Sequence, residues 1–490
     1  MHRIGTWGFG PHPWVSVERT RTFYARALQA EFELVDLDAV PPGDAAPPVD
    51  AILSFNSPRW FSEPRSETPV VMAMHGGPVV DHATLRERFG HLRTSDTLLV
   101  NCSSDEDIVR GLCEGATPHT VRLPLPVDTE LFTPYHRGDC REQLELPECD
   151  FVVGFVCRLV PQKNLHQFLR AFAQIRERML PRRVKALVVG SYYTSYPVLD
   201  YGCEGYRTDI AQLVQSLGIA DDLVSFPAKL SDEELAMAFG SMDVLFHPTS
   251  AIDENFGYVP VEAMACGVPV VGAAHGGLKD TIVPGQTGAL MPTWITRSGI
   301  RIDLDAGVEA VVELLGDEAE HERQCEAAAR RAMEGYSESV CGETLRQAFR
   351  DAIARRGGGP GASVVPTVAP AIATSSELLP PTEPSWAAFA EAVGHYVAGP
   401  APTLEPEAGV RWAAPLHRSD DGRWRLSDPA WPATLPPALD DDPLLSVCAQ
   451  VVPAGSLAQP GSARWALLER LVDDGLLIVT ARRLQAEVAA

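Results

Sequence analysis

Two carboxylates, Glu254 and Glu262, stand eight residues apart on either side of the turn Asn255-Phe256-Gly257, where a predicted helix begins. The start of a helix gathers unpaired backbone N–H groups and the positive end of the helix dipole, so it suits a phosphate or a sugar oxygen. Glu254 lies before the helix and can accept hydrogen bonds from sugar hydroxyls. Glu262 lies about two turns into the helix and can hold a diol. The pattern favours one ligand that carries both a sugar and a ribose.

Residues 254–271 resemble, without interruption, the donor-site signature of family 4 retaining glycosyltransferases, which have the GT-B fold. In that family two glutamates enclose seven residues that include Phe-Gly, and Glu-Ala-Met-Ala-Cys-Gly-x-Pro-Val-Val ends the pattern. A surface helix with two solvated acids is the alternative interpretation. The resemblance implies that Glu254 and the backbone N–H groups of residues 255–257 grip the donor sugar, while Glu262 holds the ribose.

Arg158 and Lys163 follow the predicted strand Phe151–Phe155 and resemble the family's Gly-Arg-Leu, spacer, Lys-Gly/Asn pattern, with Cys157 in place of the glycine. GT-B enzymes lack a metal-binding Asp-x-Asp and stabilise the leaving diphosphate with positive side chains and helix dipoles. The resemblance implies that Arg158, as a fork, and Lys163, as a point charge, clamp the diphosphate. Two exposed loop cations are the alternative. No metal and no cofactor are expected, and the nucleoside diphosphate sugar is a co-substrate.

Three features of the first predicted domain resemble parts of the family's site. Gly8-Phe-Gly10 follows the first strand and can bring backbone close to phosphate or sugar, although an ordinary turn has the same composition. His75 ends a predicted strand, and relatives carry a histidine there that approaches the donor sugar. The turn at residues 102–105 resembles the serine-bearing loop that faces the acceptor, although helix capping explains it equally well.

The resemblance implies retaining transfer of a hexosyl unit from a nucleoside diphosphate sugar to a soluble acceptor, such as a small metabolite, a natural product or a peptide. The expected catalytic residues are Glu254, Arg158, Lys163 and His75, and the departing phosphate oxygen is expected to take the acceptor proton. Gly276-Gly-Leu-Lys-Asp280 also resembles glycogen and starch synthases, whose N-terminal Lys-x-Gly-Gly-Leu is missing here. A glucosyltransferase of that kind and a non-catalytic partner-binding protein are the alternatives.

The net charge of −24 argues against nucleic acid and anionic membrane surfaces as partners, because both attract basic patches. Residues 1–150 contain no lysine, and no run of eighteen apolar residues exists. The N-terminus lacks the apolar core of a signal peptide, so a cytoplasmic location is expected. Ten cysteines are scattered singly, as in a protein with reduced thiols and no zinc site.

Short apolar runs alternate with helix-length connections, which predicts an α/β fold with parallel sheets covered on both faces. The expected strands include Ala51–Phe55, Pro69–Met74, Leu98–Asn101, Phe151–Phe155, Ala186–Gly190, Asp243–Phe246 and Val268–Gly272. The alternation restarts near residue 150. This restart predicts two Rossmann-like domains that face a cleft, where ligands bind at the carboxyl ends of the strands.

Five segments are predicted along the chain. Residues 1–150 form the acceptor-side domain, residues 151–335 the donor-binding domain, and residues 336–356 a helix that crosses back to the first domain. Residues 357–384 are rich in Gly, Pro, Ser, Thr and Ala, which predicts a flexible linker. Residues 385–490 form a small C-terminal domain, called here the appendage, which lies outside the resemblance.

The appendage is expected to fold, because it holds five of the nine tryptophans and disordered segments are poor in aromatic residues. The run from Ala463 to Val479 predicts a helix ended by Gly475 and followed by a strand, the outline of a winged-helix end. Residues 357–490 carry fifteen acidic residues and eight arginines, which argues against DNA. Recognition of a peptide or protein partner, or of the acceptor, is favoured, and a dimerisation or structural cap is the alternative.

Overall fold

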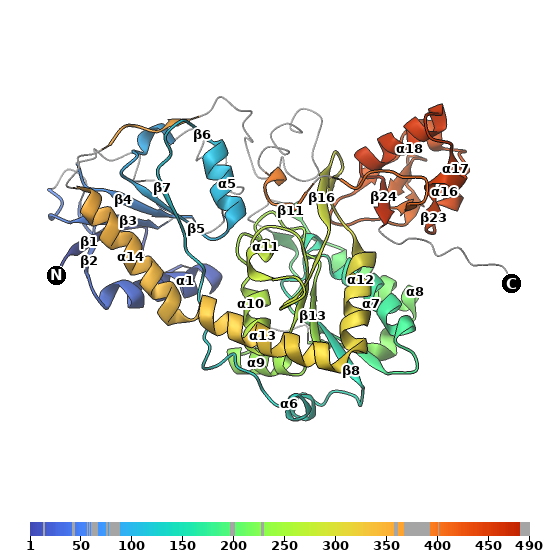
Figure 1. Cartoon of the computed structure of the whole chain (residues 1–490), viewed down its shortest axis with the longest axis horizontal. Coiled ribbons are helices and arrows are strands. Elements are labelled where there is room, and N and C mark those ends of the chain that lie inside the picture. The colour runs from blue at the N-terminus through green and yellow to red at the C-terminus, as the bar shows by residue number, and fades with distance from the viewer. Residues whose placement is uncertain are drawn as a thin grey trace.

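The computed structural model of the chain describes residues 1–12, 15–41, 45–55, 57, 59, 67–74, 77, 89–196, 201–226, 230–356, 361–366, 393–399 and 401–480. Two six-stranded sheets lie side by side, and the appendage lies against the second of them (Figure 1). Within these residues, no helix combines the length and the apolar character needed to cross a membrane.

The first sheet has the order β2-β1-β3-β4-β5-β7, and every adjacent pair is parallel. Its strands are β1 (Arg3–Trp7), β2 (Glu33–Asp36), β3 (Ala51–Phe55), β4 (Val70–Ala73), β5 (Thr97–Val100) and β7 (His119–Arg122). The described helices that connect them are α1 (Val15–Gln29) and α5 (Ser103–Gly111). Strands β4 and β5 are buried at every residue, as expected for an apolar run covered on both faces.

The second sheet has the order β12-β9-β8-β13-β14-β15 and is also parallel throughout. Its strands are β8 (Phe151–Val156), β9 (Val184–Val189), β12 (Leu223–Phe226), β13 (Val244–His247), β14 (Val270–Ala273) and β15 (Gly288–Met291). Its helices are α7 (Leu165–Arg178), α8 (Tyr206–Leu217), α9 (Asp232–Gly240), α10 (Tyr258–Ala265), α11 (Leu278–Thr281), α12 (Leu304–Gly316) and α13 (Glu318–Tyr336). The predicted α/β architecture with two Rossmann-like domains, the GT-B arrangement, is therefore confirmed.

Helix α14 (Glu338–Arg356) continues from α13 and runs back along the first domain (Figure 1). Leu345 and Phe349 of α14 lie in the same apolar core as Phe23 of α1. Arg350 also donates hydrogen bonds to both carboxylate oxygens of Glu31, at 2.8 and 2.6 Å. The segment predicted to cross back thus forms part of the core of the first domain.

Part of the predicted flexible linker pairs with the first domain. Strand β18 (Val365–Pro366) is antiparallel to β6 (Cys113–Glu114), and Thr94 donates a backbone hydrogen bond to Ala362 at 2.9 Å. The composition of residues 357–384 gave no sign of this pairing, because a two-residue strand leaves no periodic pattern. The rest of the predicted linker lies outside the described residues.

The appendage contains two three-stranded antiparallel sheets, of order β23-β19-β24 and β20-β21-β22. The strands are β19 (Gly409–Trp412), β20 (Leu416–Arg418), β21 (Trp424–Leu426), β22 (Ala433–Thr434), β23 (Val452–Pro453) and β24 (Leu477–Thr480). The helices are α16 (Leu444–Val447), α17 (Ala454–Leu457) and α18 (Ala463–Asp473). Helix α18, Gly475 and β24 confirm the predicted helix, glycine and strand, whereas the winged-helix interpretation stays a prediction.

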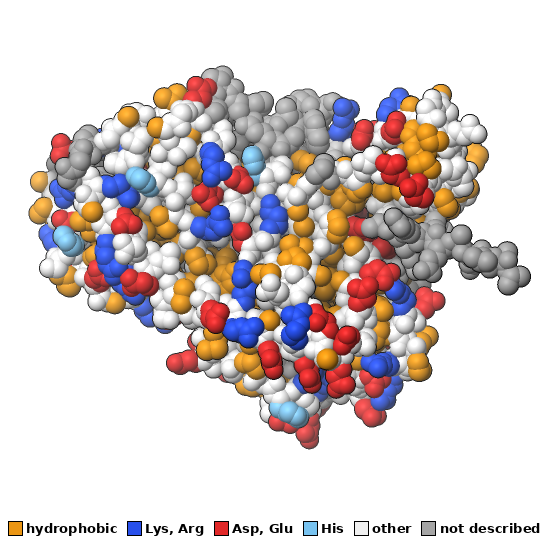
Figure 2. Space-filling view, viewed as in Figure 1, with side chains coloured by type: hydrophobic (Ala, Val, Ile, Leu, Met, Phe, Trp, Pro, Cys, Tyr) orange, Lys and Arg blue, Asp and Glu red, His pale blue; other side chains and the backbone are white. Residues whose placement is uncertain are grey.

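The appendage docks on the hairpin of β16 (Thr293–Thr296) and β17 (Gly299–Ile302). The guanidinium of Arg301 is buried and donates a hydrogen bond from Nε to the carbonyl of Gly475 at 2.8 Å. On the face of the molecule in Figure 2, acidic and basic side chains are interspersed, and its described part shows no extended basic patch.

Candidate active site

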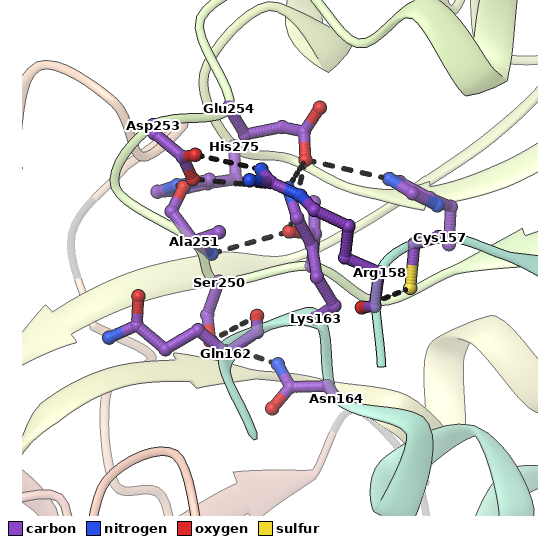
Figure 3. A network of polar contacts seen from close by, with 12 residues as sticks. Cys157, Arg158, Gln162, Lys163, Asn164, Ser250, Ala251, Asp253, Glu254 and His275 are labelled. Carbon is purple, nitrogen blue, oxygen red and sulfur yellow. Dashed lines mark hydrogen bonds and ion pairs between the residues drawn. The ribbon is translucent and has the colours of Figure 1, made fainter. Parts of the chain in front are cut away.

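Glu254 lies in the loop between β13 and α10, and its side chain points into a buried polar network (Figure 3). Lys163 donates a hydrogen bond from Nζ to Glu254 Oε2, and the Thr249 hydroxyl donates to the same oxygen at 3.2 Å. His247 Nε2 lies 3.7 Å from Oε2. All three contacts use one carboxylate oxygen. Among the described residues, none donates a hydrogen bond to Oε1.

The Lys163–Glu254 pair is charged even though both side chains are buried. Burial alone raises the pKa of Glu254, but the charge of Lys163 and the contact with His247 hold it well below its usual range. For Lys163, burial lowers the pKa, and the charges of Glu254 and Asp253 raise it above the usual lysine value. A buried charge persists only when it is paired in this way.

Asp253 is the partner of the second predicted cation. Arg158 Nη2 lies 3.0 Å from Asp253 Oδ2, and Lys163 Nζ lies 3.9 Å from Asp253 Oδ1 (Figure 3). The structure therefore brings Arg158, Lys163 and Glu254 together as predicted, with Asp253 as a fourth member that the sequence reasoning missed. Its position directly before Glu254 was the available signal.

The turn after β8 positions both cations. Residues Pro161–Lys163 form one turn of 3-10 helix, and Asn164 follows with φ at 63°, a left-handed conformation that asparagine tolerates better than most residues. The Asn164 amide donates hydrogen bonds to the carbonyl of Pro248 at 2.7 Å and to the Ser250 hydroxyl at 2.9 Å. These contacts fix the turn against the loop that carries Glu254.

The turn Asn255-Phe256-Gly257 leads into α10 as expected. Gly257 has φ at 83°, so a residue with a Cβ would be strained there. The ring of Phe256 is buried against Tyr336, with ring centroids 5.8 Å apart, so this side chain serves the core and only its backbone is available to a ligand. Gly277 donates a backbone hydrogen bond to the carbonyl of Glu254 at 2.9 Å.

Glu262 faces the first domain. Arg19 of α1 donates a hydrogen bond from Nη1 to Glu262 Oε1 at 2.7 Å, and its Nη2 lies 3.2 Å from Asp232. Burial raises the pKa of Glu262, and the Arg19 guanidinium opposes that rise. The residue predicted to hold the ribose is thus one half of an ion pair that joins the two domains. The sequence gave no sign of Arg19, because its partner lies 243 residues away.

The glycines near the N-terminus differ from each other. Gly8 has φ at 67°, and its N–H donates a hydrogen bond to Asp38 Oδ2 at 2.6 Å. A Cβ at Gly8 would collide with the carbonyl of Phe55, so this glycine is required by close backbone packing. Among the described residues other than its two chain neighbours, none has an atom within 4 Å of the Cβ position of Gly10. His75, the fourth predicted catalytic residue, lies outside the described residues.

Two segments of the predicted appendage reach the candidate site. Tyr396, from residues Val393–Gly399, is buried and donates a hydrogen bond from its hydroxyl to Asp105 Oδ1 at 2.6 Å. Trp431 is also buried and donates from Nε1 to the Ser250 hydroxyl at 2.9 Å. Both aromatic residues share an apolar cluster with strands of the first sheet. The appendage therefore contacts both domains where they face each other, through Asp105 of the first and Ser250 of the second. The sequence reasoning did not predict these contacts.

Residues 137–331 match the family described as Glycosyl transferases group 1. The D-inositol 3-phosphate glycosyltransferase of Stackebrandtia nassauensis is 35% identical over 203 residues, which are 40% of this chain and 43% of that protein. The protein of the same name from Mycobacteroides abscessus is 31% identical over 311 residues, 60% of this chain and 63% of that protein. The chain thus spans about half the length of the curated relatives it matches.

Solved structures share the fold. Sucrose-phosphate synthase from Thermosynechococcus elongatus superposes with a TM-score of 0.54 at 20% identity, covering 72% of this chain and 100% of that chain. The Anabaena protein HepE in complex with UDP-glucose superposes with a TM-score of 0.51 at 19% identity, covering 71% of this chain and 100% of that chain. The matched residues 137–331 contain Arg158, Lys163, Glu254 and Glu262, and these two solved structures share the GT-B fold of the chain.

Proposed function

We propose that this protein is a retaining glycosyltransferase that moves a hexosyl unit from a nucleoside diphosphate sugar to a soluble acceptor without a metal ion. The observation that carries the proposal is the polar network at the carboxyl edge of the second sheet, in which the buried Lys163 and Glu254 lie beside the partly exposed Arg158 and Asp253. Ligands of open parallel sheets bind at that edge. The network lies wholly within the segment that matches the family.

The two cations are the proposed hydrogen-bond donors to a diphosphate. A guanidinium has five N–H groups and an ammonium has three. Arg158 contacts Asp253, and Lys163 contacts Glu254 and lies near Asp253, so both cations are held at the edge of the sheet where the phosphate oxygens of a donor would bind. Their role is to stabilise the negative charge that develops on the leaving diphosphate, an effect that often dominates this type of catalysis.

Glu254 contributes its second oxygen to the donor sugar. Lys163, Thr249 and His247 hold Oε2 in place, so the carboxylate is fixed and negatively charged before any ligand arrives. Such a preformed acceptor loses little freedom when it binds a sugar hydroxyl. Glu262 is proposed to take the ribose diol, in exchange for part of its contact with Arg19.

The test begins with calorimetric titration of the purified chain with UDP-, GDP-, ADP- and TDP-sugars. A uridine nucleotide is the first choice, because HepE was solved with UDP-glucose. Saturation with the true donor at about a hundred times its Kd should raise the free energy of unfolding by about 2.7 kcal/mol. Slow donor hydrolysis should follow, and EDTA should leave its rate unchanged. A folded chain that binds none of these nucleotide sugars would contradict the proposal.

Arg158→Ala is expected to lower kcat by about a hundredfold with a small effect on donor KM, because its charge acts mainly on the leaving group. Arg176→Ala is the matched control, since Arg176 also pairs with an aspartate, Asp222, but lies in the last turn of α7. Turnover by Arg158→Ala at the wild-type rate would overturn the assignment of the clamp.

A further inference from the structure

Residues Val393–Gly399 place one hydroxyl group, that of Tyr396, between the two domains. The Tyr396 side chain is fully buried, and its hydroxyl donates a 2.6 Å hydrogen bond to Asp105 in the first turn of α5. Asp105 is itself fully buried. A buried phenol that contacts a buried carboxylate is unusual in a surface appendage, because both groups lose their hydration.

The backbone around Tyr396 is held by the loop that follows β14 and by α11. Gly276 donates a backbone hydrogen bond to the carbonyl of Tyr396 at 2.8 Å. Lys279 donates from Nζ to the carbonyl of His395 at 2.7 Å and to that of Val397 at 3.3 Å. The segment is therefore anchored on both sides of the tyrosine, and its hydroxyl has a defined position.

The Tyr396 hydroxyl lies next to the loop between β13 and α10, which carries Glu254. Gly77 has φ at 75°, and a Cβ there would lie 2.8 Å from the Tyr396 hydroxyl oxygen and 3.0 Å from the Cβ of Asn255. The Tyr396 hydroxyl, Gly77 of the first domain and Asn255 thus lie close together. The ring of Tyr396 also packs on His275, with ring centroids 5.4 Å apart, and His275 Nε2 contacts the carbonyl of Ala251 at 2.9 Å.

Asp105 is suited to take a proton from this hydroxyl. Burial raises the pKa of Asp105 to about 7, although the hydrogen bonds from Tyr396 and from the Asn101 backbone oppose the rise. A carboxylate with a pKa near neutrality is an effective general base when it lies within hydrogen-bond distance of the group that reacts. Burial, together with the charge of Asp105, raises the pKa of the Tyr396 hydroxyl well above its ordinary value, so its proton has to leave as the new bond forms, and a base in contact can receive it at that moment.

We propose that Tyr396 is itself a sugar acceptor, so that the protein glycosylates its own appendage. This inference rests on the proposed function, because the donor comes from the site built around Glu254 and Arg158. In the reaction a bond forms between the phenolic oxygen of Tyr396 and the anomeric carbon. The bond from that carbon to the diphosphate oxygen breaks, and the nucleoside diphosphate leaves with the electron pair. The phenolic proton passes to Asp105.

The experiment is intact-mass spectrometry of the full chain after incubation with each nucleotide sugar of the panel. The expected result is a gain of one sugar residue per chain, which peptide mapping by tandem mass spectrometry places on Tyr396. The rate of the gain should not depend on protein concentration, because the acceptor belongs to the same molecule as the site. Peptide mapping of the wild-type chain makes this test independent of how well any variant folds.

Tyr396→Phe should remove the gain, whereas Tyr193→Phe, which changes an exposed tyrosine, should keep it. Donor binding and hydrolysis by the wild-type chain without any gain in mass would overturn this inference and leave the proposed function standing. A chain that binds no donor would contradict both proposals.

Discussion

At the scale of single residues, the candidate site depends on charges that have been removed from water. Lys163 and Glu254 are each less than one-tenth exposed, and their mutual attraction offsets the loss of hydration. The remaining contacts of Glu254 with Thr249 and His247 satisfy the same oxygen. Such a pair defines the shape of the site more than it stabilises the fold, because its desolvation cost is of similar size to its attraction.

Removing only one partner of this pair should therefore be costly. Lys163→Met leaves the Glu254 carboxylate buried without its counter-charge and is expected to lower the free energy of unfolding by about 3–5 kcal/mol. The double variant Lys163→Met, Glu254→Gln removes both charges and should recover much of that loss. Urea denaturation of the four proteins of the cycle measures the coupling. Equal stability of the single and double variants would contradict a charged pair.

Asp105 should make stability depend on pH in an uncommon direction. Its pKa rises from an ordinary 3.8 to about 7 in the folded chain, so the folded state holds a proton that the unfolded state has released. Its contribution to stability is present below about pH 4 and is lost as the pH rises to about 7. The contribution that disappears is at most about 4 kcal/mol, at about 1.4 kcal/mol per pH unit.

The variant Asp105→Asn stays neutral at every pH. The difference in the free energy of unfolding, variant minus wild type, should therefore be larger and more positive at about pH 8 than at about pH 5, which means that the variant gains stability relative to the wild-type chain as the pH rises. Any loss of contacts caused by the amide is the same at both values and cancels in the comparison. A difference that does not change with pH would show that the carboxylate is ionised throughout this range.

At the scale of elements, loops at the carboxyl ends of β8, β13 and β14 bring the site together. The sequence predicted seven strands, and each is present within two residues at either end. Of the other strands, β2, β7, β12 and β15 lie at the edges of the two sheets. An edge strand is partly exposed, so it lacks the continuous apolar run that marks a central parallel strand.

The site was predictable where the chemistry lies within one short stretch of chain. Glu254, Glu262 and the turn between them share one pattern, and Arg158 and Lys163 share another. Arg19, Asp105 and Tyr396 were missed, because each meets its partner only through the folded arrangement of distant segments. No local periodicity records a contact between residues hundreds of positions apart.

The contact between α1 and α10 can be tested at the same scale. Arg19→Ala leaves Glu262 buried without its donor and should lower the free energy of unfolding by about 1–3 kcal/mol. Arg26→Ala changes an exposed arginine of the same helix, whose ion pair with Glu338 lies at the surface, and should cost less than about 1 kcal/mol. Thermal denaturation at equal ionic strength compares the loss of stability in the two variants. Equal losses of stability in the two variants would show that the Arg19–Glu262 pair contributes no more than an ordinary surface ion pair.

At the scale of the whole molecule, the appendage packs against both domains where they face each other. The apolar cluster that holds Trp7, Val70 and Leu98 of the first domain also holds Tyr396 and Trp431. The Trp431 indole lies against Gly299, where a Cβ would collide with the ring. A C-terminal domain so placed contributes to the stability of the other two, which its separate position in the sequence did not indicate.

Trp431→Ala should therefore destabilise the whole chain. The loss of a buried tryptophan costs about 3–5 kcal/mol, and the Ser250 hydroxyl also loses its donor. Limited proteolysis should then cut the variant between α14 and the appendage sooner than the wild-type chain. Trp424→Ala, a half-buried tryptophan within the appendage, is the control. Equal protease resistance of Trp431→Ala and wild type would show that the appendage is held elsewhere.

The ion pair between Arg19 and Glu262 has a kinetic consequence. In the ligand-free chain, the glutamate proposed to take the ribose already holds a guanidinium from the opposite domain. A nucleotide can complete its contacts only in the fraction of molecules in which that pair is open, and its apparent affinity is reduced by the same fraction. Nucleotide capture would then be limited by the opening of the two domains, and the observed binding rate should reach a plateau as the nucleotide concentration rises.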